Sequence, residues 1–106
     1  MTFTAALTQQ GRTAVITLTG DMDEPGASLF HDKIEDASTG DVEELVLDMS
    51  KLESISSAGL RGLTFCRQKM GDDVQIVLVS PSEAVRRSIE QADLQQSVSF
   101  ADRVPD

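Results

Sequence analysis

The clearest candidate for a reactive site in this sequence is a pair of adjacent serines, Ser56 and Ser57. They begin a segment whose apolar spacing and basic last turn predict a helix. One serine hydroxyl is enough to cap a helix N-terminus. The other is then exposed at the positive end of the helix, where we expect the backbone amides of Ala58, Gly59 and Leu60 to be free and to favour a negative group. These amides and the helix dipole would hold a phosphoryl group on that second hydroxyl.

Phosphorylation at this position would change the surface of the protein sharply. A phosphate adds about -1.5 to -2 charges. The acidic segment 21–24 follows a predicted strand, and neighbouring strand ends share one edge of a sheet, so we expect this segment to adjoin the serines. A partner docked on that edge would meet new repulsion and bulk. The pattern predicts a phosphorylation switch, with helix capping alone as the simpler alternative.

Other reactive side chains do not assemble into a catalytic set. His31, the one histidine, falls on the polar side of an amphipathic segment, as a solvated surface residue does. Cys66 falls inside a predicted helix on a face shared with Gly59 and Gly62, which favours a buried core position. The two glycines lack the lysine of a phosphate-binding loop, so we expect them to let the helix lie close to a strand. We therefore expect no catalytic residue and no enzymatic activity.

Metal and cofactor binding are not expected either. The acid pairs Asp21/Asp23 and Asp72/Asp73 are typical of solvated loops. One cysteine and one histidine cannot build a Cys/His metal cluster, and a single cysteine excludes an internal disulfide. The N-terminus lacks the basic region and the apolar run of a signal peptide or membrane span. We expect a cytoplasmic protein without direct membrane insertion.

The charge of the chain is negative and concentrated in its middle. Eighteen Asp and Glu residues against nine Lys and Arg give the 106-residue chain a formal net charge of -9 at pH 7. Residues 21–53 hold eleven of the acids and two of the bases. The negative net charge argues against a nucleic acid partner, because the phosphate backbone of a nucleic acid would repel the protein. Two interpretations stay open: a solvated face that aids solubility, and a field that steers a basic partner protein.

Alternating hydrophobic periods predict an α/β domain. The expected elements are, in order, a hairpin of strands 3–8 and 14–19, helix 27–37, strand 44–48, helix 56–70, strand 75–79, helix 82–92 and an edge strand at 98–101. Residues 20–26 are predicted to form a turn-rich acidic loop, with Asp23 or Ser28 available to cap the first helix. On that helix, Leu29 and Ile34 are expected to face the core. The predicted fold is a mixed four- to five-stranded sheet with helices packed against it.

Two sequence motifs resemble a known family. The run LVLDMSKLESISSAGLRGL at residues 45–63 is similar to the signature of the STAS domain in bacterial anti-sigma factor antagonists. The run ITLTGDMD at residues 16–23 resembles the strand of that family that ends in Gly-x-Leu-Asp before the first helix. The order of elements matches the family over about residues 3–100. The resemblance implies a single STAS domain over residues 1–106.

The resemblance also implies a partner-switching role. In this family the unphosphorylated domain binds an anti-sigma factor that is also a serine kinase with a histidine-kinase-like ATPase fold, and so frees the sigma factor. The kinase phosphorylates a serine at the start of the second helix, which dissolves the complex, and a PP2C-type phosphatase reverses this. The family's Asp-Ser-Ser-Gly becomes Ser56-Ser57-Ala58-Gly59 here. When the family's motif is aligned with this sequence at Gly59, the phosphate acceptor corresponds to Ser57, with Ser56 as the alternative.

A partner-binding surface around that serine is a further implication of the resemblance. Its expected members are Asp21, Asp23, Ser56, Ser57, Ala58, Gly59, Leu60 and Arg61. Arg61 follows Ser57 by four residues and shares its helix face, from which it can pair with a phosphate or contact the partner. The alternative function is an accessory STAS subunit of a lipid-transport or membrane-transporter complex, without phosphorylation switching.

Overall fold

The computed structural model describes residues 2–104. Its elements, in chain order, are β1 (Thr4–Gln10), β2 (Thr13–Met22), α1 (Glu24–Ser38), β3 (Glu44–Ile55), α2 (Ser57–Met70), β4 (Gln75–Val79), α3 (Glu83–Gln91), η1 (Gln95–Ser97) and β5 (Ser99–Ala101). The order of strands and helices is the predicted one, with the short 3-10 helix η1 added before the last strand.

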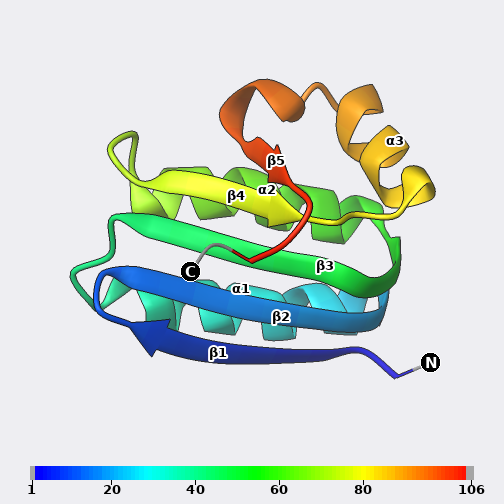
Figure 1. Cartoon of the computed structure of the whole chain (residues 1–106). Helices are drawn as coiled ribbons and strands as arrows, with labels where there is room; N and C mark the ends of the chain where they lie inside the picture. Colours follow the sequence, from blue (N-terminus) through cyan, green and yellow to red (C-terminus); the bar gives the residue numbers. More distant parts are fainter. Residues whose placement is uncertain (1, 105–106) are drawn as a thin grey trace.

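The described residues form one five-stranded mixed sheet in the order β1-β2-β3-β4-β5. β1 pairs antiparallel with β2, and the other neighbouring strands pair parallel. Helices α1 and α2 lie side by side over one face of the sheet (Figure 1). The chain after β5 crosses the other face, where Val104 packs with the buried Val46 and Val77. The predicted α/β class and mixed sheet are confirmed.

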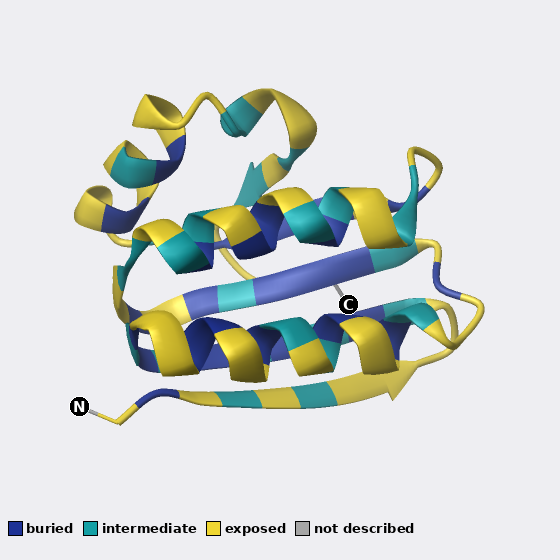
Figure 2. Cartoon of the chain, turned by 180° about the vertical axis from the view of Figure 1, so that it is seen from behind, coloured by how far each residue is buried: buried dark blue, intermediate teal, exposed yellow. Residues whose placement is uncertain are grey.

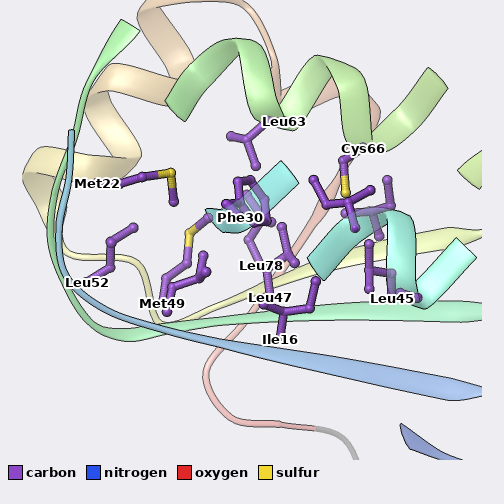
Figure 3. Packing of buried hydrophobic residues seen from close by; sticks show 14 of the residues in the cluster. Ile16, Met22, Phe30, Leu45, Leu47, Met49, Leu52, Leu63, Cys66 and Leu78 are labelled. Atoms are coloured by element: carbon purple, nitrogen blue, oxygen red, sulfur yellow. The ribbon is translucent and has the colours of Figure 1, made fainter. Parts of the chain in front are cut away.

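The main hydrophobic core lies between the sheet and the two helices α1 and α2. Half-buried and buried residues alternate along β2, as expected for a strand with one covered face. Ile16 of β2, Leu47 of β3, Phe30 of α1 and Leu63 of α2 meet in this core (Figure 3). The outward sides of both helices are exposed (Figure 2). This core therefore fixes where β2 leads into α1 and where β3 leads into α2.

Several predicted boundaries are confirmed. β4 covers residues 75–79 as predicted. α2 ends at Met70 with Gly71 as its C-cap, and Ser82 caps α3. The described β5 falls inside the predicted edge strand. The boundaries of these elements could be predicted because capping or turn residues lie beside them.

Three strands run past the ends that their apolar runs predict, and the first of them, β1, ends at Gln10, two residues later than expected. β3 continues past the predicted end at Asp48, with Met49 and Leu52 buried in the core. Its pairing with β2 shifts register twice, and each shift adds one residue to β3. Such bulges break the alternation of apolar and polar residues by which a strand is recognised. β2 likewise runs on through Gly20 to Met22, where the sequence predicts a loop.

α1 begins three residues before its predicted start. The side chain of Asp23 caps it by accepting a hydrogen bond of 2.9 Å from the Gly26 amide. The core-facing side of the helix runs through Phe30 and Ile34, both fully buried. The prediction that Leu29 faces the core is wrong, because this residue falls beside that stripe and is 48% exposed.

Candidate functional site

The ends of β2 and β3 bring the two sequence motifs side by side. Asp21 pairs with Ser54 in the parallel register. The Ser54 hydroxyl donates a hydrogen bond of 2.7 Å to Asp21 Oδ1. The Ser56 amide donates one of 2.9 Å to the carbonyl oxygen of Met22. The expected placement of segment 21–24 beside the serine pair is therefore present.

The two serines at the start of α2 differ in their surroundings. Ser56 is the half-buried N-cap, and its Oγ accepts a hydrogen bond of 3.2 Å from the Gly59 amide. Ser57 is the first helical residue and is exposed. Within residues 2–104, the Ser57 hydroxyl has no hydrogen-bond partner. Ser56 is therefore the helix cap, and Ser57 carries the exposed hydroxyl.

Fewer amides are free at this helix start than the sequence suggests. The Gly59 amide is taken by the Ser56 hydroxyl oxygen, and the Leu60 amide donates to the Ser56 carbonyl oxygen at 2.9 Å. The expectation of free amides is wrong for both residues. In the part of the chain that the structure describes, the amides of Ser57 and Ala58 have no hydrogen-bond acceptor. These two N–H groups lie next to the exposed hydroxyl at the positive end of α2.

Two glycines determine how closely α2 approaches its neighbours. A Cβ at the buried Gly59 would lie 2.6 Å from Ile55 Cγ1 and 2.8 Å from Met22 Sδ. The helix start thus rests directly on the ends of β2 and β3. A Cβ at Gly62 would lie 3.0 Å from Phe30 Cδ2. The predicted close approach to a strand is confirmed for Gly59, whereas Gly62 makes room for a ring on α1.

Asp21 and Asp23 each have a structural partner. The hydrogen bond from the Ser54 hydroxyl holds the pKa of Asp21 below its usual value. The exposed Asp23 caps α1 through the Gly26 amide. Both carboxylates are thereby positioned at the junction of β2 and α1, so they combine a structural role with a place on the predicted docking surface.

Most of the predicted partner-binding residues reach the surface. Asp23, Ser57 and Arg61 are exposed, Asp21, Ser56, Ala58 and Leu60 are half-buried, and Gly59 is buried. They gather where β2 leads into α1 and where β3 leads into α2. Among residues 2–104, no carboxylate forms an ion pair with Arg61. Arg61 follows the exposed Ser57 by about one helical turn.

A groove of about 520 Å³ opens between α1 and α2 beside this surface. Glu24 and His31 line it from α1, and Ala58 and Arg61 line it from α2, among others. The His31 ring stacks on Phe65 with centroids 3.7 Å apart. His31 thus lies at the surface as predicted, with its side chain 43% exposed, but its ring packs on Phe65 and is only partly solvated. Helical spacing locates each residue on its own helix, but it does not report how two helices are rotated toward each other.

The remaining reactive groups are not brought to this site. Cys66 is buried in the core, where loss of hydration raises the pKa of its thiol to about 12. Asp72 and Asp73 lie just before β4, at the opposite end of the parallel strands from Asp21. Within residues 2–104, no group of three or more His, Cys, Asp or Glu residues is placed to hold a metal ion. None of the described helices is long and apolar enough to cross a membrane.

This architecture resembles that of known proteins. Over 94 residues, the chain is 26% identical to the anti-sigma-F factor antagonist RsfB of Mycobacterium tuberculosis, an alignment that covers 89% of this chain and 77% of that protein. An anti-sigma factor antagonist from Mycobacterium paratuberculosis has a similar structure, with a TM-score of 0.87 and 22% identity over 97% of this chain and 88% of that chain.

SpoIIAA is similar in two forms. The unphosphorylated anti-sigma factor antagonist has a TM-score of 0.82 and 22% identity over 94% of this chain and 90% of that chain. The phosphorylated Bacillus cell fate determinant has a TM-score of 0.74 and 21% identity over 94% and 93%. Residues 4–106 of the present chain match the family model of the STAS domain. The matched range begins with β1 and includes every described strand and helix. The chain therefore belongs to the STAS domain family.

Proposed function

We propose that this protein is an anti-sigma factor antagonist, which binds an anti-sigma factor while unphosphorylated and thereby releases a sigma factor. RsfB and SpoIIAA, which are named as such antagonists, support this function. The observation that carries the proposal is the exposed hydroxyl of Ser57 beside the capping hydroxyl of Ser56. The protein acts by binding and not by catalysis, as a cytoplasmic regulator.

The anti-sigma factor docks where β2 leads into α1 and β3 into α2. Asp21 and Asp23 contribute negative charge to this surface, and Arg61 lies at its other side on α2. A basic patch on the partner complements the two carboxylates, which speeds association and selects the partner. The buried Gly59 takes part through its backbone, because it lets the helix start rest on the two strand ends.

Phosphorylation of Ser57 ends this interaction. The anti-sigma factor is also a serine kinase of the histidine-kinase-like ATPase fold. It transfers the γ-phosphoryl group of ATP to Ser57 Oγ, and the hydroxyl proton and ADP leave. The ester adds about -1.5 to -2 charges near Asp21 and Asp23, which repels the partner. A PP2C-type phosphatase hydrolyses the ester and restores the hydroxyl.

The fold is suited to carry the phosphate. The amides of Ser57 and Ala58 at the positive end of α2 can donate to its oxygens. The guanidinium of Arg61, one turn further, can pair with it. We therefore expect phosphorylation to change the surface and not the fold.

Phosphopeptide mapping tests the acceptor. The anti-sigma factor is first recovered by pull-down with the unmodified protein in the absence of ATP, and is then incubated with each variant and ATP. We expect one phosphate on Ser57 in the wild type and in Ser56→Ala, and none in Ser57→Ala. Full phosphorylation of Ser57→Ala would overturn Ser57 as the acceptor and would direct attention to Ser56.

The same pull-down separates this function from that of an accessory subunit of a membrane transporter. An antagonist releases its partner when ATP is added, because the kinase modifies it. A transporter subunit keeps its partner under both conditions, and that result would contradict the proposed switch.

A further inference from the structure

The outer edge of β1 is a long and unprotected border of the sheet. β1 has seven residues, and one side of it pairs with β2 through an unbroken register. Among residues 2–104, no strand pairs with its other side. Figure 2 shows β1 running along the border of the sheet beside α1. Such an edge presents a row of backbone N–H and C=O groups that can pair with another strand.

β1 lacks the features that usually block strand addition. Residues 2–11 contain no charged residue and no proline. Natural sheets protect their edges with charges, proline, bulges or very short strands. The opposite edge of this sheet follows the rule, because β5 has only three residues and the charged Asp102 and Arg103 follow it. The contrast marks β1 as an edge that is open to pairing.

The hairpin determines which backbone groups of β1 face outward. Gln10 pairs with Thr13 across a two-residue turn, and in such a hairpin the closing pair exchanges backbone hydrogen bonds. Alternation then directs the N–H and C=O groups of Ala5, Leu7 and Gln9 away from β2. These residues are the available donors and acceptors of the edge.

We propose that a second copy of this chain adds to this edge, with the two β1 strands antiparallel and Leu7 opposite the same residue of the second copy. In this register Ala5 lies opposite Gln9 and Ala6 opposite Thr8, so the outward backbone groups of the two copies meet. All seven residues of β1 are paired. The interface is self-complementary about a two-fold axis, as closed homodimers require, and the two sheets become one continuous sheet.

Charge favours a second copy at this edge. The chain carries a net charge of -9, but every Asp and Glu residue follows position 20. Two copies that approach through β1 therefore pair uncharged strands. Apolar surface adds to the attraction, since Leu7 is half-buried and its counterpart would cover it. Leu29, 48% exposed, lies on the same border, because Gly26 one turn earlier packs on Phe3 just before β1.

The dimer and the proposed function involve different parts of the molecule. The axis passes near Leu7, in the middle of β1, whereas Ser57 lies beyond the ends of β2 and β3. The two copies of the candidate functional site thus lie at opposite ends of the joined sheet and stay open. A dimer of this kind presents two docking surfaces.

Sedimentation equilibrium over a wide range of protein concentrations tests the dimer. We expect a reversible monomer–dimer equilibrium for the wild type. The association should strengthen between about 0.05 M and about 0.5 M NaCl, because salt screens the repulsion between two acidic chains. A wild type that stays monomeric at every concentration would overturn the proposal.

A pair of double variants tests the register. Ala6→Lys with Thr8→Lys places like charges directly opposite each other in two pairs, and we expect dimerisation weakened by roughly tenfold. Ala6→Lys with Thr8→Glu is the matched control, because it places opposite charges in the same pairs and should preserve the dimer. Both positions are exposed, so thermal unfolding should show both variants folded. If the Lys/Lys variant dimerises as well as the wild type, another surface is responsible and the proposal is wrong.

Discussion

Ser54 and Asp21, 33 residues apart in the sequence, are joined by a hydrogen bond of 2.7 Å from the Ser54 hydroxyl to Asp21 Oδ1. The bond ties the end of β2 to the end of β3, at the edge of the sheet where α1 and α2 begin. A hydroxyl donor favours the charged form of a carboxyl group, and the pKa of Asp21 is therefore held below its usual value. The surface around Asp21 thus keeps its negative charge to lower pH than an isolated aspartate would.

Replacing Ser54 by alanine should raise the pKa of Asp21 toward its ordinary value, because the hydroxyl donor is lost. A carboxyl with a lowered folded pKa stabilises the fold above its unfolded pKa, and this stabilisation is lost as pH falls through the folded pKa. In Ser54→Ala that loss on the acid side should shrink. An NMR titration of the Asp21 carboxyl carbon measures the change.

Ser50→Ala is the control for this titration, since the Ser50 hydroxyl donates to Asp48 and not to Asp21. The Asp21 titration should be the same in Ser50→Ala as in the wild type. An Asp21 pKa that does not move in Ser54→Ala would show that the hydrogen bond does not lower it.

Ser56→Ala should lower the free energy of unfolding by about 1 kcal/mol, because it removes the cap that accepts from the Gly59 amide. Ser57→Ala should change that free energy by less than about 0.5 kcal/mol, because an exposed side chain without hydrogen bonds contributes little. Urea unfolding compares the two variants. Equal losses would mean that the two hydroxyls share the capping role.

Gly59→Ala should lower the free energy of unfolding by about 1–3 kcal/mol, because the added methyl would collide with Ile55 and Met22. The better helix propensity of alanine offsets part of the cost. Gly62→Ala is the matched control on the same helix. Its methyl would lie 3.0 Å from the Phe30 ring, so the loss should be smaller. A larger loss in Gly62→Ala, measured by urea unfolding, would contradict this account.

The end of α2 and the start of α3 could be predicted from their capping residues, whereas the start of α1, with both Asp23 and Ser28 available as caps, and the far ends of β2 and β3 could not. Gly71 and Ser82 mark helix ends through local backbone chemistry, which is legible in the sequence. The far half of β3 follows no single period, because its two register shifts interrupt the alternation. Its core residues Met49 and Leu52 are recognised only when β2 is known to lie beside them.

Some features of the candidate site could likewise be predicted from the sequence, and others could not. The proximity of Asp21 to the serine pair could be predicted, because neighbouring strand ends share an edge. The identity of the serine that caps α2 could not be predicted from residue type, since both positions carry serine. The end of β3 decides it, because the Ser56 amide is bound to Met22 and this holds Ser56 in the extended conformation of a cap. The contact of His31 with Phe65 depends on the rotation of two helices, which neither helix encodes alone.

Cys66 should be inert toward thiol reagents in the native protein at neutral pH. Burial raises the pKa of its thiol to about 12, and the thiolate is the reactive form. Its labelling by an aromatic disulfide reagent should therefore follow the unfolded fraction as urea is added. Gly59→Ala, which we expect to be less stable, should be labelled faster at the same urea concentration. Rapid labelling of the folded wild type would mean that the helix around Cys66 opens locally.

Ser57→Asp should weaken binding of the anti-sigma factor, because it adds a negative charge beside Asp21 and Asp23. The variant should stay folded, since a carboxylate in the first turn of α2 interacts favourably with the helix dipole. Ser57→Asn is the matched control, with nearly the same shape and no charge, and Ser57→Ala should bind without regulation. Isothermal titration calorimetry should give a dissociation constant for Ser57→Asp at least about fivefold higher than for Ser57→Asn. Equal constants for these two variants would show that charge at Ser57 does not control docking.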